Sequence, residues 1–106
     1  MKIQINTDKT ISGSENQEDY FTSLITEKLN RFQSHISRIE VHLSDENEKK
    51  EGHDDIQCIL EARIEGRDPI AVTCEADTVK NAVSGAIDKV KISLETILGR
   101  MKNRER

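Results

Sequence analysis

The chain has 106 residues, and its 20 acidic side chains outnumber its 16 basic ones to give a formal net charge of −4. With one proline and three aromatic residues the core has to be aliphatic, and this length predicts a single domain over residues 1–106. No apolar run approaches the length that spans a bilayer, and the amino terminus lacks a signal-peptide pattern. We therefore expect a soluble, cytoplasmic protein without a membrane partner.

Two elements are expected in the first third of the chain. Residues 2–6 alternate in polarity, which predicts a short strand. Residues 17–35 place apolar side chains three and four positions apart, which predicts an amphipathic helix. We expect Ser14 or Asn16 to cap this helix, because either side chain can accept a hydrogen bond from a backbone N–H of the first turn.

Three segments in the middle of the chain alternate in polarity and predict further strands, over residues 38–44, 56–65 and 70–74. The segment 45–55 between the first two is strongly charged and contains a glycine, so we expect a mobile acidic loop. Gly66-Arg67-Asp68 is typical of a turn and joins the last two strands as a hairpin.

The last third of the chain, residues 76–106, predicts one long amphipathic helix. Thr78 offers a capping hydroxyl at its start, and Asp77 suits the positive end of the helix dipole. Its apolar stripe consists of Val79, Val83, Ala86, Ile87, Val90, Leu94, Ile97, Leu98 and Met101. The basic tail 100–106 either complements the dipole or contacts a polyanion.

The predicted order is β-α-β-β-β-α, and half-buried strands favour a mostly antiparallel four-stranded sheet with one solvated face. Both helices then cover the other face, which makes an α+β two-layer sandwich. The charge is divided between the elements: residues 1–75 carry a formal charge of −7 and residues 76–106 a charge of +3. The mean charge therefore hides a basic last helix on an acidic body.

Cys58 and Cys74 are expected to point inward from neighbouring strands as reduced, structural thiols. Counting from the turn sets Leu60, and not Cys58, opposite Cys74, which disfavours a disulfide. The three histidines show no metal-ligand spacing with each other or with the cysteines, so we expect neither a metal nor another cofactor.

The sequence has no pattern that indicates catalysis. It has no Gly-rich phosphate loop, no GxSxG motif and no Cys/His constellation. A core this small with so few aromatic residues disfavours a deep pocket. We therefore expect neither an enzyme nor a small-molecule substrate.

Several short motifs resemble those of the short hibernation-promoting factors and ribosome-associated inhibitors, a family also known as sigma-factor modulation or ribosomal subunit interface proteins. The motifs are Lys28-Leu29-x-Arg31-Phe32, Ile39-Glu40-Val41-His42-Leu43, Ala82-Val83 and Ile87-Asp88-Lys89-Val90-x-x-x-Leu94. The resemblance covers nearly the whole chain, and the predicted order of elements is that of the family.

The resemblance implies binding to small-subunit rRNA in the decoding channel, which silences idle ribosomes under stress or in stationary phase. Matching the family's basic positions implies phosphate contacts at Lys28, Arg31, Lys89 and Arg100. Lys91, Lys102 and Arg104 extend the basic side of the last helix and complete the predicted RNA-binding set. Such contacts do not depend on the base sequence of the RNA, and they weaken as the salt concentration rises.

The chain also departs from the family pattern. The chain has Ile92 where the family usually has Arg, Thr96 where the family has Lys, and Lys80 where the family has Tyr. Asp88 and Glu95 reduce the positive charge of the same surface. Each lost phosphate contact removes a counterion-release contribution to affinity.

An alternative function follows from these departures: a protein-interaction or dimerisation module on the same fold, with weakened RNA binding. A weak homodimer would be one form of it. A patch that joins Ile92 with Ile59 would mark such a contact, although single exposed aliphatic residues are ordinary. Without the resemblance, Lys28 and Arg31 are explained as solvated charge on a helix.

Overall fold

The computed structural model describes residues 1–7, 15–45 and 56–104, and gives only the backbone of residues 15–17, 45 and 100–104. Its elements are β1 (Lys2–Thr7), α1 (Glu15–Lys28), the 3-10 helix η1 (Asn30–Phe32), β2 (Ile36–Asp45), β3 (Ile56–Ile64), β4 (Ile70–Ala76) and α2 (Val79–Arg104). This order confirms the predicted β-α-β-β-β-α arrangement. The expected mobile acidic loop lies, apart from its first residue, outside the described residues.

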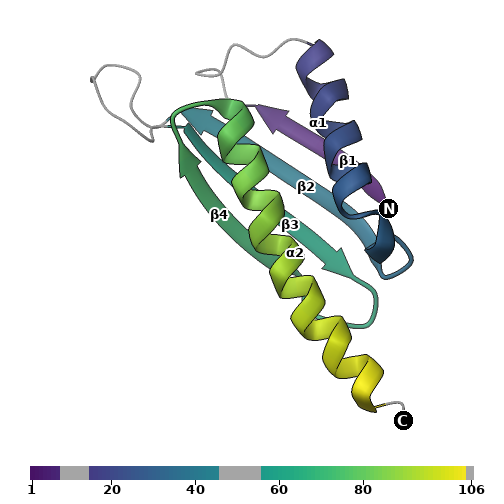
Figure 1. The fold of residues 1–106 in the computed structure, drawn as a ribbon. Coiled ribbons are helices and arrows are strands. Elements are labelled where there is room, and N and C mark those ends of the chain that lie inside the picture. The colour runs from purple at the N-terminus through teal and green to yellow at the C-terminus, as the bar shows by residue number, and fades with distance from the viewer. Residues whose placement is uncertain (8–14, 46–55, 105–106) are drawn as a thin grey trace.

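The four strands form one sheet in the order β1-β2-β3-β4, so β1 and β4 are its edges. β1 pairs with β2 in parallel, whereas β2–β3 and β3–β4 pair antiparallel. Figure 1 shows both helices on the same face of the sheet, with α1 over β1 and α2 running across β3 and β4. The predicted two-layer α+β sandwich is confirmed.

The core lies between the sheet and the two helices. Alternate strand residues point into it, because successive side chains of a strand point to opposite faces. Fully buried side chains come from both layers: Ile25, Leu29, Ile39, Val41, Leu60, Val83, Val90 and Leu94 have no exposed area. Burying each of these aliphatic side chains contributes about 1.5–3 kcal/mol relative to leaving it in water.

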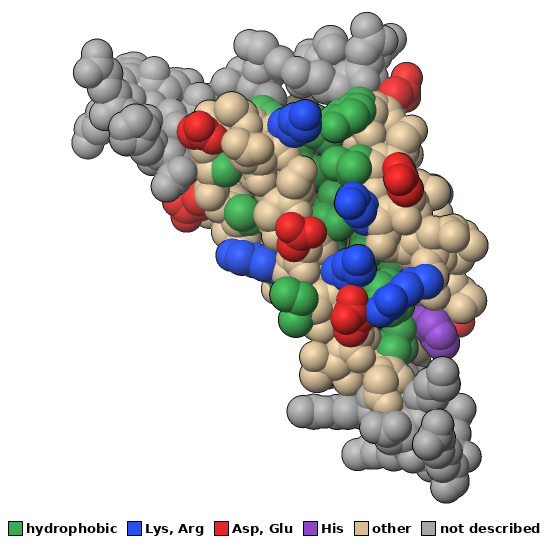
Figure 2. All heavy atoms as spheres, in the orientation of Figure 1, with side chains coloured by type: hydrophobic (Ala, Val, Ile, Leu, Met, Phe, Trp, Pro, Cys, Tyr) green, Lys and Arg blue, Asp and Glu red, His purple; other side chains and the backbone are tan. Residues whose placement is uncertain are grey.

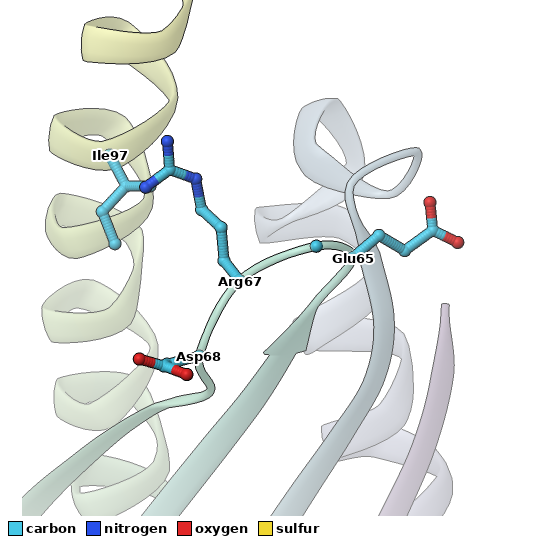
Figure 3. Close-up of a pocket in the computed structure, with 5 residues that line it drawn as sticks. Glu65, Arg67, Asp68 and Ile97 are labelled. Atoms are coloured by element: carbon cyan, nitrogen blue, oxygen red, sulfur yellow. The ribbon is translucent and has the colours of Figure 1, made fainter.

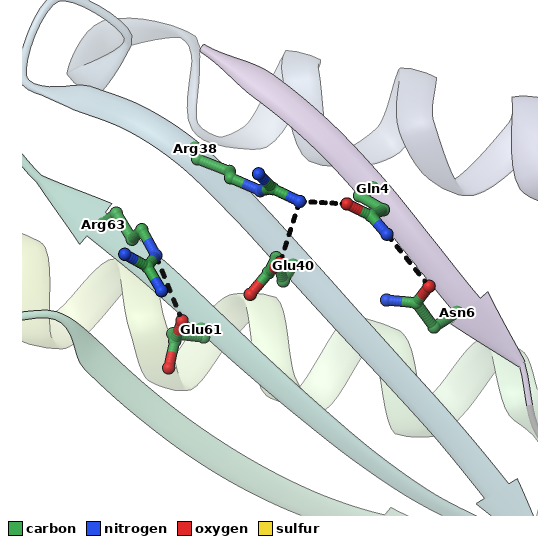
Figure 4. Close-up of polar contacts among 6 residues, drawn as sticks. All are labelled: Gln4, Asn6, Arg38, Glu40, Glu61 and Arg63. Atoms are coloured by element: carbon green, nitrogen blue, oxygen red, sulfur yellow. Dashed lines mark hydrogen bonds and ion pairs between the residues drawn. The ribbon is translucent and has the colours of Figure 1, made fainter.

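The outer face of the sheet is polar and connected by hydrogen bonds and ion pairs (Figure 4). Arg38 on β2 donates to Gln4 on β1 and lies 2.9 Å from Glu40. Arg63 and Glu61 form a second pair on β3 at 3.5 Å. These side chains alternate with core residues, so this face of the sheet is solvated, as predicted.

The first helix is shorter than predicted, since α1 ends at Lys28 and does not continue to His35. Leu29 has backbone angles of φ −107° and ψ 13°, outside the α-helical region, and the tighter turn of η1 follows. Leu29 and Phe32 are nevertheless buried. Asn16 lies inside α1 and so is not its cap, while Ser14 lies outside the described residues.

The amino end of α2 is capped as predicted. The backbone N–H of Asn81 donates to Thr78 Oγ1 at 3.1 Å, and the Asn81 side-chain amide donates to Asp77 Oδ1 at 3.1 Å. Thr78 therefore satisfies one of the backbone donors that the first turn leaves free.

The predicted register of the β3–β4 hairpin is wrong. Cys58, and not Leu60, is the partner of Cys74, and Leu60 pairs with Val72. The hairpin is centred on Gly66, whose φ of 75° suits a residue without a Cβ, and not on the following Arg67. Moving the centre by one residue moves every cross-strand partner by two.

Candidate nucleic-acid interface

A shallow groove runs between α1 and α2 on the helical face of the molecule. It contains a hollow of about 140 Å³ lined by Leu24, Lys28, Ser84, Ile87 and Asp88. The floor is apolar and the rim is charged, and Figure 2 shows hydrophobic side chains between the helices with Lys and Arg beside them. We call this feature the interhelical groove.

Arg31 reaches across the interhelical groove from η1. One of its terminal nitrogens, Nη2, lies 3.2 Å from Glu95 Oε1 on α2, and the two side chains are 61% and 45% exposed. The Arg31 guanidinium also lies 4.6 Å from the centre of the Phe32 ring. An exposed ion pair contributes at most about 1 kcal/mol, so this arginine is held loosely and remains accessible to an anion.

Two lysines of α2 lie on the side that faces α1. Lys91 follows Ile87 by one helical turn, and Lys80 precedes Ser84 by one turn; both reference residues line the hollow. Lys80 was not among the predicted RNA contacts, although its spacing of three turns from Lys91 places both on one row of the helix. Lys28, Arg31, Lys80 and Lys91 are called the groove cations below.

Lys89 lies on the opposite side of α2. Its ammonium nitrogen donates to the backbone carbonyl of Thr73 on β4 at 2.7 Å. The structure therefore separates Lys89 from Lys28 and Arg31. The side chains of Arg100, Lys102 and Arg104, predicted to bind RNA, lie outside the described residues.

Two carboxylates interrupt the groove cations. Asp88 lines the hollow with Lys28, and Glu95 pairs with Arg31. Figure 2 shows red and blue side chains interspersed over this face, so the positive surface is not continuous. The named groups still leave a formal excess of two positive charges at the groove.

The sequence model of the family described as Sigma 54 modulation protein / S30EA ribosomal protein matches residues 3–102. The chain belongs to this family. The resemblance seen in the sequence motifs is thereby confirmed.

Solved structures show the same fold. The chain is similar to the N-terminal domain of Thermus thermophilus Protein Y, with 17% identity, a TM-score of 0.71, and 92% of this chain and 99% of that one covered. It is also similar to a ribosomal subunit interface protein from Coxiella burnetii, with 18% identity, a TM-score of 0.70 and coverages of 93% and 99%. Among curated proteins, none matches the chain.

The departures from the S30EA family pattern fall on different sides of α2. Lys80 is a groove cation, whereas Ile92 is 67% exposed on the outer surface of the helix. Thr96 donates its hydroxyl to the Ile92 carbonyl at 3.0 Å. Ile59 alternates with the buried Cys58 and Leu60 and therefore faces the other side of the sheet, so it does not form a patch with Ile92.

A second hollow, of about 600 Å³ and wide open, lies where the β3–β4 turn approaches α2. Glu65, Gly66, Arg67, Asp68 and Ile97 line it, and Figure 3 shows Arg67 and Ile97 directed toward one another across it. The hollow is open to solvent and its lining carries charges of both signs. The five lining residues form no catalytic constellation.

Within the described part of the chain, no three His, Cys, Asp or Glu side chains gather closely enough to hold a metal ion. No helix among the described residues is both long and apolar enough to cross a membrane.

Proposed function

We propose that this protein is a cytoplasmic, ribosome-associated translation inhibitor that binds small-subunit rRNA in the decoding channel through the outer face of its two helices. Membership of the S30EA ribosomal protein family is the observation that carries this proposal. The geometry supports the proposed binding surface, because cations from both helices lie beside the interhelical groove.

The groove cations would act on the phosphate backbone. An exposed lysine or arginine that neutralises a phosphate releases a counterion, and this gain does not depend on base sequence. Binding of this kind positions the domain in a channel lined by RNA. A helix of 26 residues, about 39 Å long, then fills the space that mRNA and tRNA need, so inhibition requires no catalysis.

The test is co-sedimentation of the protein with purified small subunits at two salt concentrations. Lys28→Glu/Lys91→Glu should weaken binding by tenfold or more, roughly, and lower the slope of log affinity against log salt by about 2. Lys2→Glu/Arg63→Glu is the matched control, since it changes the net charge equally on the far face of the sheet. Equal losses of affinity in the two variants would show that the groove is not the surface that binds the small subunit.

A second function, a protein-interaction or dimerisation module, is favoured by the 67% exposure of Ile92 on the same helix. Ile92→Asp should then abolish any concentration-dependent dimer seen in light scattering, while leaving binding to small subunits within about twofold. A monomer at all concentrations counts against this alternative.

A further inference from the structure

Cys58 and Cys74 occupy directly opposed positions on β3 and β4, and both are free thiols. Both belong to the side of the sheet that the helices cover, since Cys58 is fully buried in the core and Cys74 packs against it. The corrected hairpin register thus brings together the two cysteines that the sequence had appeared to keep apart.

The spacing of opposed residues suits a covalent bond. Directly opposed residues of antiparallel strands have Cα atoms about 4.5–5.5 Å apart, and disulfides occur at Cα separations of about 4.4–6.8 Å. Residues displaced by two positions lie about 7–8 Å apart, which a disulfide cannot bridge without backbone movement. The pairing in register is therefore the condition for a bond.

The two thiols differ in access. Burial, and secondarily the neighbouring Cys74, raises the pKa of Cys58 to about 12 from 9.0, so at neutral pH Cys58 stays protonated inside the core. Cys74 is only half-buried and lies on the edge strand. A soluble oxidant therefore meets Cys74 first, and Cys58 is placed to react second.

We propose that Cys58 and Cys74 form a reversible disulfide by exchange with a small-molecule disulfide such as oxidised glutathione. The Cys74 thiolate attacks one glutathione sulfur, which forms a mixed disulfide and releases one glutathione thiolate. The small fraction of Cys58 that loses its proton then attacks Cys74 Sγ and releases the second glutathione as a thiolate, which takes up a proton. Two protein thiols are oxidised and one glutathione disulfide is reduced to two thiols.

The bond would change how α2 rests on the sheet. The Cys74 sulfur fills the space beside Gly85, where a methyl group would overlap it. Turning this sulfur toward Cys58 withdraws it from Gly85. The preceding residue of β4, Thr73, accepts the hydrogen bond from Lys89 at its backbone carbonyl, so two contacts of α2 depend on this short stretch.

The full chain is reduced, freed of reductant and incubated for hours with oxidised glutathione, and thiols are then blocked and the protein digested with trypsin. Wild type should yield peptides 51–63 and 68–80 joined by a bond that dithiothreitol reverses. The matched control is Val72→Cys/Cys74→Ala, which keeps two thiols but moves one out of register with Cys58. It should form the linked pair at least tenfold more slowly, roughly.

Accumulation of glutathione on Cys74 alone in wild type would overturn the proposal, as would equal linking in the control. Amide hydrogen exchange of the oxidised protein reports on the helix: exchange over residues 82–89 should rise several-fold, with α1 unchanged. Unaltered exchange there would overturn the coupling to α2. Neither measurement involves RNA, so its outcome is independent of the proposed function.

Discussion

The two long sides of α2 are built differently. On the side that faces α1, charged residues line an open groove, and the contact between Arg31 and Glu95 is an exposed ion pair. On the side that rests on β4, Gly85 lies against Cys74, and Lys89 is bonded to a strand carbonyl. The two sides of α2 therefore engage their cations through different contacts, an ion pair on one side and a hydrogen bond to the strand backbone on the other.

This difference teaches that a basic helix need not present all its cations to a partner. Lys89 and Lys91 are two residues apart and fall on opposite sides of α2. Lys89 is bonded to a strand carbonyl on one side, and Lys91 lies beside the interhelical groove on the other. Measurements that separate stability from RNA binding should therefore sort the substitutions by side.

The largest effect on stability is expected at alkaline pH, from Cys58 on β3, the cross-strand partner of Cys74 on β4. Because the pKa of Cys58 is raised to about 12 in the folded protein from an ordinary 9.0, the unfolded chain loses this proton first. The contribution of the protonated Cys58 thiol to the free energy of unfolding is fully present below pH 9.0 and is lost as pH rises toward 12. The free energy of unfolding should fall by about 1.4 kcal/mol per pH unit above the ordinary value.

Urea unfolding of the reduced protein from about pH 8 to about pH 10.5 measures this slope. Cys58→Ala should be less stable at neutral pH but should lack that part of the alkaline decline. Parallel declines in the two proteins would show that the thiol does not carry the effect.

Gly85→Ala is expected to lower the free energy of unfolding by about 1–2 kcal/mol, because the added methyl group overlaps Cys74 Sγ. Gly99→Ala, in the same helix with nothing within reach of a methyl group, should instead raise it by about 0.5–1 kcal/mol. Thermal unfolding monitored by circular dichroism compares the two.

Removing the sulfur tests the cause of the Gly85 effect. In a Cys74→Ala background, Gly85→Ala should become neutral or stabilising, because the obstructing atom is gone and alanine is the better helix former. An unchanged loss in that background would place the clash elsewhere.

Lys89→Met should lower stability by about 0.5–1 kcal/mol through loss of the bond to Thr73, with little effect on RNA affinity. Lys28→Met, on the groove side, should show the reverse: stability within about 0.5 kcal/mol and RNA affinity reduced several-fold. Urea unfolding and filter binding of small-subunit rRNA measure the pair, and matching profiles would contradict the division of α2.

The smallest stability change is expected for Glu95→Gln, within about 0.5 kcal/mol, since the ion pair with Arg31 is exposed. RNA affinity should rise a few-fold, because the substitution frees a groove cation and removes a repulsive charge. The same filter-binding assay detects this gain, and Glu27→Gln, on the exposed surface of α1, controls for net charge.

The fold was predictable from the sequence because burial alternates along each strand and recurs every three or four residues in each helix. Thr78 marked the start of α2 through chemistry that is local to the first turn. The end of α1 was missed because Leu29, Phe32 and Ile36 continue the apolar spacing and are all buried, although the backbone leaves the α conformation at Leu29. Apolar spacing reports burial more directly than backbone geometry.

The hairpin register and the arrangement of the groove depend on details that the pattern does not contain. Counting from the turn required knowing that Gly66, with its positive φ, occupies the centre. The sequence indicated that Lys28 and Arg31 share a surface with the basic last helix. It could not indicate that Lys89 binds Thr73 or that Glu95 pairs with Arg31, since these contacts follow from how the layers pack.

The bond from Lys89 also affects how this molecule behaves among its own copies. β4 is an edge strand, and outward backbone groups of such a strand are a template on which a strand from another molecule can add. The Lys89 ammonium group on the Thr73 carbonyl places a full positive charge on this edge strand. A second β4 approaching edge to edge would bring its own lysine to the same place, so we expect the repulsion between the two ammonium groups to disfavour extension of the sheet from one molecule to the next.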